Sequence, residues 1–385
     1  MTAFAFNTVA SIVSEPGAAA RLGPLLAERF TDARRVLNVT DPGFLRTGLL
    51  EPAKASLSEA GFAVSVYSDV VADPPEDIVN AAVYFARSKA IDLVIGFGGG
   101  SSMDVAKLVA VLAGSTQPLS QIYGIGNVKG KRLPLVQVPT TAGTGSEVTN
   151  IAIVTTGATT KMGVVAPQLY ADMAVLDATL TLGLPPLVTA ATGIDAMVHA
   201  IEAYTSKHKK NPLSDNLARE ALRLLSKSLM VAVEDGSNLD ARQAMLLGAC
   251  LAGQAFSNAP VAAVHALAYP IGGIFHVPHG LSNSLVLPHV LRFNASHAAP
   301  LYAELAEIVV PGVKGSNTER TEGLIAAMQE IAQRTGIETR LQQMGIAETD
   351  LDRLADDAML QTRLLGNNPR ELTRADARAI YAAAL

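Results

Sequence analysis

Residues 95–107 read IGFGGGSSMDVAK, a β-like apolar run that passes through glycines into a helical pattern. Glycines let a backbone approach a diphosphate closely, and a helix N-terminus offers free N–H groups with a favourable dipole. Ser101 or Ser102 can cap that helix and donate to phosphate oxygens. Ser101 stands where the third glycine of the G-x-G-x-x-G fingerprint would lie. Alone, the stretch indicates a phosphate cradle or a tight structural turn.

A second loop of small and hydroxyl side chains follows the β-like run 134–138, and residues 139–149 read PTTAGTGSEVT. Open α/β sheets bind ligands at the carboxyl ends of their strands. The alternative is a polar turn with a helix cap. Because two such loops follow neighbouring strands, we interpret them together as a dinucleotide site.

Asp41 directly follows another β-like run, 35–40, in an Asp-Pro-Gly turn. A carboxylate there can accept both ribose hydroxyls and repels a 2′-phosphate, which favours NAD over NADP. An ordinary turn is the alternative.

The first half of the chain alternates β-like and helical stretches. Strands are expected at 35–40, 63–67, 92–97 and 134–138, helices from the Asp-Pro-Gly turn through 54 and at 76–89, and a hairpin at 151–156 and 162–166. This alternation predicts right-handed crossovers and a mainly parallel sheet. Beyond about 187 the pattern is helical and rich in alanine. We therefore predict an α/β dinucleotide-binding domain at 1–185 and an all-α metal-binding domain at 186–385.

Composition and net charge bear on which partners and which compartment to expect. The net charge is -5, and binding to nucleic acid needs a basic face. No run approaches the roughly 18 uninterrupted apolar residues of a membrane span. The single cysteine and the absence of a leading positive charge favour the cytoplasm. The low charged fraction, 17%, favours a buried subunit interface in a homodimer or larger homo-oligomer.

Histidines are unevenly placed in the second half. Asp195 and His199 lie four apart on a predicted helix, so they share one face. Four of the seven histidines fall within residues 265–289: His265, His276, His279 and His289. One carboxylate with up to three imidazoles suits Fe²⁺ or Zn²⁺. The alternative is a set of structural carboxylate–histidine hydrogen bonds.

Five motifs in this order resemble the iron-containing alcohol dehydrogenase family over essentially the whole chain: GGGSSMDVAK, PTTAGTGSEVT, GIDAMVHAIEAY, HALAYPIGGIFHVPHG and GNNPR. The resemblance implies a fold like that of dehydroquinate synthase, with an N-terminal dinucleotide-binding domain, a helical C-terminal domain and an active site in the cleft between them. It also implies that Fe²⁺ or Zn²⁺ is held by Asp195, His199, His265 and His279.

The same matching implies a set of cofactor-binding residues: Asp41, Asp73, Gly98, Gly99, Gly100, Ser101, Ser102, Asp104, Thr140, Thr141, Thr144, Thr149 and Lys161. Three features depart from many relatives, and one of them is the apolar pair Leu364 and Leu365 just before the Asn-Pro-Arg element, which suggests an apolar pocket. Asp73 replaces an asparagine before a proline near the nicotinamide, and Tyr269 replaces a histidine four residues after His265. Tyr269 and His276 are therefore the candidates for proton transfer; the alternative is that Tyr269 packs and His276 faces solvent.

The resemblance predicts metal-dependent hydride transfer between a small alcohol or aldehyde and NAD. A dehydroquinate synthase-like cyclase or a maleylacetate reductase-like dicarboxylate reductase would need Lys and Arg near the metal, and the segments around the ligands contain none. The other alternative is a catalytically weak regulatory homologue.

Overall fold

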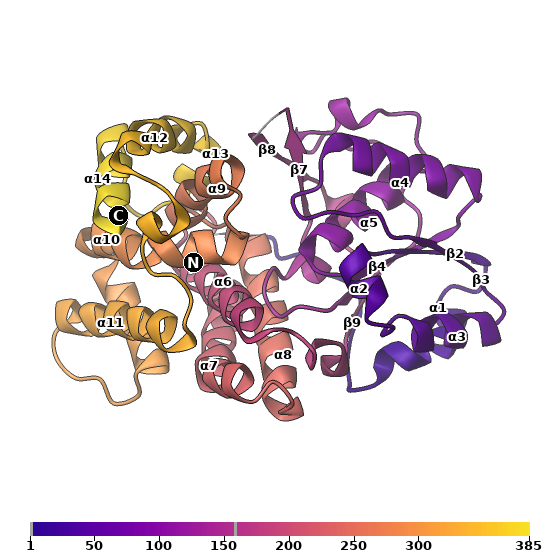
Figure 1. Cartoon of the computed structure of the whole chain (residues 1–385), viewed down its shortest axis with the longest axis horizontal. Helices are drawn as coiled ribbons and strands as arrows, with labels where there is room; N and C mark the ends of the chain where they lie inside the picture. Colours follow the sequence, from indigo (N-terminus) through magenta and orange to yellow (C-terminus); the bar gives the residue numbers. More distant parts are fainter. Residues whose placement is uncertain (1–2, 158–159) are drawn as a thin grey trace. The chain divides into compact units, whose positions relative to one another are not determined.

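The computed structural model describes residues 3–157 and 160–385, which fall into two units (Figure 1). The α/β unit consists of Thr8–Thr141 and Gly145–Leu182. The helical unit consists of residues 3–7, Ala142–Thr144 and Gly183–Leu385. The predicted domain bounds at residue 185 stay a prediction, because compactness does not show that either part folds alone.

A six-stranded parallel sheet is the centre of the α/β unit, in the order β1-β9-β6-β4-β2-β3. Its strands are β1 (Ile12–Ser14), β2 (Arg35–Val39), β3 (Ala63–Tyr67), β4 (Leu93–Gly98), β6 (Leu135–Pro139) and β9 (Met173–Leu176). The predicted mainly parallel sheet is confirmed. The sequence reading missed β1 and β9, which are short.

Helices cover both faces of this sheet. They are α1 (Leu22–Arg29), α2 (Pro42–Arg46), α3 (Glu51–Glu59), α4 (Glu76–Ser88) and α5 (Gly100–Leu112). Apolar side chains of α1 and α3 pack with one face, among them Leu22 and Leu57 against Ile95 and Phe97. Helix α5 packs against β4 and β6, beside α4.

The single helix predicted through residue 54 is wrong. Two helices, α2 and α3, replace it, because Gly48 adopts a left-handed conformation (φ 74) between them. Pro52 lies in the first turn of α3, where its missing N–H costs nothing.

A second sheet of three strands, in the order β5-β8-β7, completes the α/β unit. Its strands are β5 (Gly124–Ile125), β7 (Ile151–Thr156) and β8 (Thr160–Val165). The antiparallel pairing of β7 with β8 confirms the predicted hairpin.

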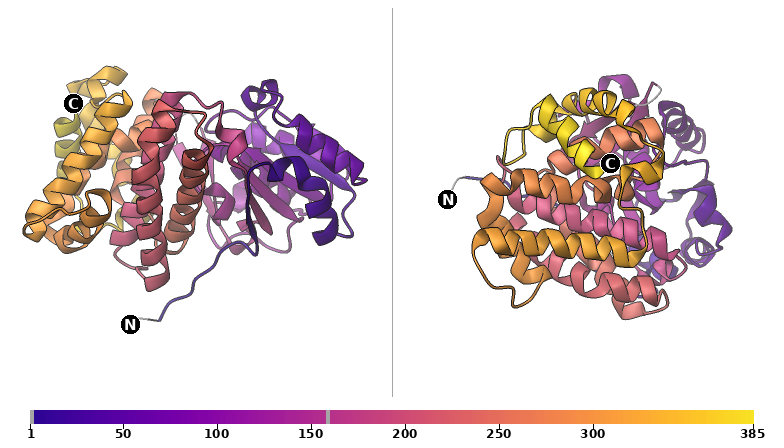
Figure 2. Two further views of the ribbon diagram at one scale, coloured as in Figure 1. Left: turned by 90° about the horizontal axis from the view of Figure 1, so that it is seen from below. Right: turned by 60° about the vertical axis from the view of Figure 1, so that its left-hand side comes forward.

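The described residues from 183 onward form helices and no strand. These helices are α6 (Pro186–Thr205), α7 (Pro212–Glu234), α8 (Leu239–Asn258), α9 (Ala263–Phe275), α10 (His279–Val309), α11 (Asn317–Thr335), α12 (Leu351–Met359), α13 (Thr362–Leu365) and α14 (Arg374–Ala384). Helix α6 is buried along its whole second half and packs against α7, α8 and α10 (Figure 2). The all-α character of this part is confirmed.

No single helix among the described residues is both long enough and apolar enough to span a membrane. Only α8 and α9 taken as a pair meet both conditions, and that pair is bent by 107°.

Candidate metal centre and cofactor loops

Four side chains of the helical unit converge on one point. The potential ligand atoms of Asp195, His199, His265 and His279 all lie within 4.8 Å of one another. Helix α6 supplies Asp195 and His199 from one face, α9 supplies His265, and His279 is the first residue of α10. The structure thus brings together the whole metal set that the resemblance implied.

Close approach of α10 to α6 depends on Gly280. A Cβ atom at this position would lie 2.3 Å from the carbonyl oxygen of Ala191 and 3.3 Å from Cβ of Asp195. Any side chain at residue 280 would therefore push the first turn of α10, with His279, away from α6. This close packing explains why a glycine follows the last histidine of the HALAYPIGGIFHVPHG motif.

Burial and neighbouring side chains shift the pKa values of His199 and Asp195 in directions that suit metal binding. Burial lowers the pKa of His199 to about 3, and the neighbouring carboxylate of Asp195 offsets only part of that shift. His199 is therefore neutral at pH 7 and carries a free lone pair. Burial opposes ionisation of Asp195, but His199, His279, His265 and a hydrogen bond from Asn283 outweigh it and lower the Asp195 pKa. An ionised carboxylate beside the neutral imidazole of His199 offers two donors that suit a divalent cation.

Glu202 fixes the orientation of His265. Its Oε2 accepts a hydrogen bond from Nδ1 of His265 at 2.6 Å, and its Oε1 accepts one from the backbone N–H of Val264 at 2.7 Å. With the proton on Nδ1, the Nε2 lone pair faces the other ligands. A carboxylate behind a metal-binding imidazole fixes the tautomer in this way. The sequence reading missed Glu202, although it lies three residues after His199 in the motif.

The contacts of the Asn283 amide indicate that a cation fits between the four candidate ligands. Its Nδ2 donates to Oδ1 of Asp195 at 2.6 Å and lies 3.3 Å from Nε2 of both His265 and His279. Three acceptors thus face one electropositive N–H₂ group inside a buried pocket of side chains. Acceptors that converge in this manner suit a divalent ion, so the residues present fit the metal that the family implies.

The glycine-rich turn in the α/β unit lies beside Asp41. A Cβ at Gly98 would stand 2.7 Å from Oγ of Ser102 and 3.5 Å from Oδ2 of Asp41. The backbone N–H of Thr140 donates to the carbonyl of Gly98 at 3.0 Å, which joins the second loop to the first. Oδ1 of Asp41 caps α2 by accepting from the N–H of Phe44 at 2.8 Å. Asp41 is thus a turn residue, and its second oxygen points toward the glycines.

A second group of predicted cofactor residues gathers at Asp73. Lys161 forms an ion pair with Asp73, with 2.7 Å between Nζ and Oδ1. Oγ of Ser101 accepts a hydrogen bond from the N–H of Asp73 at 3.3 Å. Asp73 has a left-handed backbone (φ 50), which is uncommon for a residue with a Cβ. Strain of this sort is characteristic of functional loops.

Asp104 and Thr149 lie in a buried network around Lys107, another residue that the sequence reading missed. The fully buried Lys107 ammonium donates to Oγ of Ser146 (2.7 Å), Oγ1 of Thr149 (3.0 Å) and the carbonyl of Ile151 (2.7 Å). Asp104 accepts from the Ser146 hydroxyl at 2.6 Å. This network ties α5 to the second loop. The cofactor roles of Asp104 and Thr149 stay predictions, and the observed contacts give both side chains a structural role.

The loop between β6 and β7 is divided between the units. Thr140 and Thr141 belong to the α/β unit, whereas Thr144 belongs to the helical unit. Within the helical unit, a Cβ at Gly143 would lie 2.7 Å from Cβ of Thr192, so only a glycine fits there.

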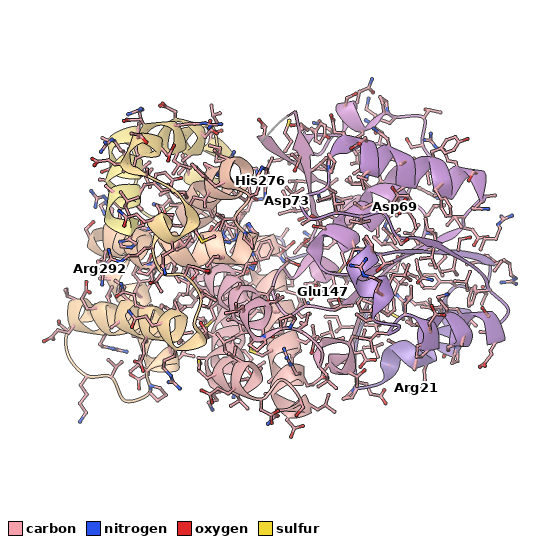
Figure 3. All side chains as sticks on the ribbon, viewed as in Figure 1. Arg21, Asp69, Asp73, Glu147, His276 and Arg292 are labelled. Carbon is pink, nitrogen blue, oxygen red and sulfur yellow. The ribbon has the colours of Figure 1, made fainter. Side chains whose placement is uncertain are left out.

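The two proton-transfer candidates differ in position. The ring of Tyr269 lies 6.0 Å from that of His279, and it is half-buried. His276 is exposed and ends α9 in a left-handed conformation (φ 55; Figure 3). The structure therefore brings Tyr269 next to a metal ligand and gives His276 no such neighbour in any described contact. Both roles stay predictions.

Comparison with known proteins agrees with this geometry. Residues 10–178 match the family model described as iron-containing alcohol dehydrogenase, and residues 189–385 match the model of the C-terminal part of the Fe-containing alcohol dehydrogenase family. The chain is 45% identical to long-chain-alcohol dehydrogenase 1 of Geobacillus thermodenitrificans, over 91% of this chain and 90% of that protein. It is 34% identical to the NAD-dependent methanol dehydrogenase of Bacillus methanolicus, over 100% of both.

Among solved structures, 1,3-propanediol oxidoreductase has a TM-score of 0.95 at 33% identity, over 100% of both chains. The motifs, the fold and the ligand set lead to the same conclusion. The chain belongs to the iron-containing alcohol dehydrogenase family.

Proposed function

We propose that this enzyme transfers a hydride between a primary or small secondary alcohol and NAD, with Fe²⁺ at Asp195, His199, His265 and His279. The observation that carries the proposal is the convergence of these four ligand atoms, with Glu202 orienting one of them. A divalent ion bound there stabilises the negative charge of a substrate oxygen, and the nicotinamide supplies the hydride chemistry.

The α/β unit supplies every residue of the proposed cofactor set except Thr144. Backbone N–H groups at Gly99–Ser102 begin α5 and suit the diphosphate of NAD. The carboxylate of Asp41, beside Gly98, suits a ribose and opposes the 2′-phosphate of NADP. Asp73, Lys161, Thr140, Thr141, Thr144 and the remaining predicted positions complete the proposed set.

An uncharged substrate suits the sequence around the ligands. Residues 186–205 and 263–285 contain no Lys or Arg, so these segments offer no cationic side chain for a dicarboxylate or a phosphorylated acid. This composition favours an alcohol or aldehyde over the substrate of a maleylacetate reductase-like enzyme. The relatives include proteins named for long-chain alcohols and for methanol, so the length of the substrate's carbon chain has to be measured.

The test is an NADH absorbance assay over a panel of alcohols and aldehydes, with protein loaded separately with Fe²⁺ and Zn²⁺. We expect about one ion per chain, activity with neutral alcohols, and loss of both metal and activity in His265→Ala. Undiminished metal content in this variant would refute the ligand assignment, and an Fe²⁺-loaded enzyme idle on the whole panel would refute the activity. The control is Glu307→Gln, an exposed change on α10.

We further propose a cytoplasmic homo-oligomer. The sequence holds a single cysteine, Cys250, which is buried and can form no disulfide within the chain, and this suits a reducing compartment. Light scattering on the purified protein gives the oligomeric state, and a monomer at micromolar concentration would refute that part.

A further inference from the structure

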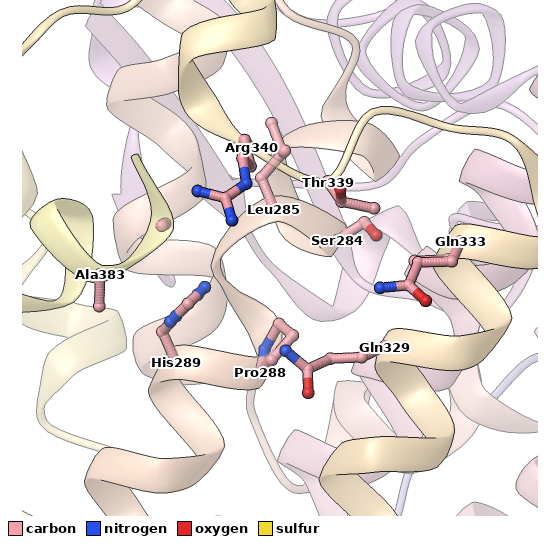
Figure 4. Close-up of a pocket in the computed structure, with 11 residues that line it drawn as sticks. Ser284, Leu285, Pro288, His289, Gln329, Gln333, Thr339, Arg340 and Ala383 are labelled. Atoms are coloured by element: carbon pink, nitrogen blue, oxygen red, sulfur yellow. The ribbon is translucent and has the colours of Figure 1, made fainter.

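A cavity in the helical unit lies outside the ligand set (Figure 4). It is lined by residues of α10, α11 and α14 and by the turn before Arg340, and it opens to solvent at the exposed Arg340, Gln333 and Ala383. Its volume is about 160 Å³. One water needs only roughly 10–15 Å³, so a small organic molecule fits.

The polar part of the cavity wall is rich in donors and carries one full charge. Arg340 supplies a guanidinium, Ser284 a hydroxyl, and Gln329 and Gln333 supply amides. No carboxylate occurs among the described residues that line the cavity. Figure 4 shows the Arg340 guanidinium and the His289 ring pointing toward one another. The wall therefore offers several N–H and O–H groups and no negative charge to balance Arg340.

His289 is neutral at pH 7. Burial, together with the nearby cations Arg292 and Arg340, lowers its pKa to about 4. Arg292 does not line the cavity itself: it donates to Oε1 of the lining residue Gln329 at 3.0 Å and forms an ion pair with Glu322 at 3.7 Å. The charge that an occupant meets in the cavity is therefore close to a single positive one.

Apolar side chains lie among these polar ones (Figure 4). They are Leu285 and Pro288 of α10, Ala332 of α11 and Ala383 and Ala384 of α14. A ligand complementary to both kinds of side chain has one anionic end and a short hydrocarbon tail.

We propose that this cavity binds a small organic carboxylate, with the carboxylate at Arg340 and His289 and the tail along Leu285 and Ala383. The planar fork of a guanidinium matches the two oxygens of a carboxylate. A single positive charge balances one such group, whereas a phosphate dianion would leave one negative charge uncompensated. Ser284 directly follows Asn283 on α10, so the cavity shares a helix with the metal centre.

Calorimetric titration of the metal-loaded enzyme with sodium butyrate tests the proposal. We expect saturable binding to the unaltered protein, and binding at least about tenfold weaker in Arg340→Gln, because a charged partner is lost. The matched control is Arg223→Gln, which removes an equal charge from an exposed residue of α7. Butyrate affinity equal in Arg340→Gln and in the unaltered protein would overturn the proposal, and so would absence of binding to the unaltered protein.

A second variant separates the cavity from a general effect of surface charge. Ala383→Phe fills the space beside the apolar side chains from an exposed position and leaves Arg340 in place. We expect it to lose butyrate binding with its thermal unfolding unchanged. Butyramide should bind more weakly than butyrate, and so should inorganic phosphate. If phosphate binds as tightly as butyrate, or if Ala383→Phe keeps full butyrate affinity, the carboxylate site is refuted.

Discussion

The contact between Glu202 and His265 makes a quantitative prediction about metal affinity. Glu202 is almost fully buried and accepts two hydrogen bonds, from Nδ1 of His265 and from the N–H of Val264. In Glu202→Gln the amide has one oxygen and one N–H₂ group, so it cannot accept both. If the oxygen stays with Val264, the N–H₂ group faces Nδ1 of His265. That nitrogen must then accept, which moves the ring proton to Nε2 and removes the lone pair directed at the site.

The expected decrease in metal affinity follows from the hydrogen bond to His265 that Glu202→Gln removes. A hydrogen bond to a buried charged group contributes about 1.5–3 kcal/mol. Loss of such a partner behind a metal-binding histidine weakens metal affinity by roughly 10–100-fold. We therefore expect the dissociation constant for Zn²⁺ or Co²⁺, measured by competition with a chromophoric chelator, to rise within that range in Glu202→Gln. The activity of the metal-saturated variant should fall less than its affinity.

Glu307→Gln is the matched control, because Glu307 is an exposed carboxylate of the same unit that pairs with Arg320 and accepts from the N–H of Gly312. Thermal unfolding of metal-free protein shows whether either change affects the fold. If Glu202→Gln binds metal as tightly as the control while both are folded, Glu202 does not position His265 and the reasoning fails.

Three further predictions concern the cofactor loops and the proton route. Burial raises the Glu147 pKa to about 7, so the free energy of unfolding should fall by about 3 kcal/mol at most between pH 4.5 and 7, because over this range the unfolded carboxyl is ionised while the folded one keeps its proton; urea unfolding of Glu147→Gln should lack this slope. Asp41→Gly should raise kcat/KM for NADP by roughly 5- to 150-fold, for about 1–3 kcal/mol of repulsion removed, and should lower it for NAD; an unaltered enzyme that prefers NADP contradicts this. If His276 passes the proton, His276→Ala should lower kcat with metal retained and flatten the pH–rate profile between roughly pH 6 and 9; an unchanged profile ends that proposal.

The sequence predicts those features that local pattern determines. The strands β2, β3, β4 and β6 follow from apolar runs bounded by turns, and the hairpin β7–β8 from alternation. The four metal ligands follow from spacing and from ordered motifs. Strands β1 and β9 have three and four residues, which is too short for a period to be recognised. The split between α2 and α3 depends on the backbone of Gly48, and its left-handed φ cannot be read from composition.

Lys107 and Glu147 show a different limit. Both are charged residues in a helix or loop, and such residues are usually exposed. Their burial results from packing of α5 against the loop that follows β6, which brings Ser146, Thr149 and Ile151 around the Lys107 ammonium. Desolvation lowers the pKa of Lys107, and the nearby charge of Asp104 counters it. A buried ion pair is costly to break because one charge is then left without its partner.

Glu202 was predictable in principle from the arrangement of α6. Asp195, His199 and Glu202 occupy positions i, i+4 and i+7, which fall on one stripe of a helix. Between them every residue of this helix is apolar, so a stripe of three polar side chains has no solvent to face and must face a polar site. Two of the three point their ligand atoms at the converging point, and the third reaches it through His265. The physical rule is that a polar residue on the stripe of a buried ligand pair belongs to the same site, even when it contacts a ligand side chain instead of the converging point itself.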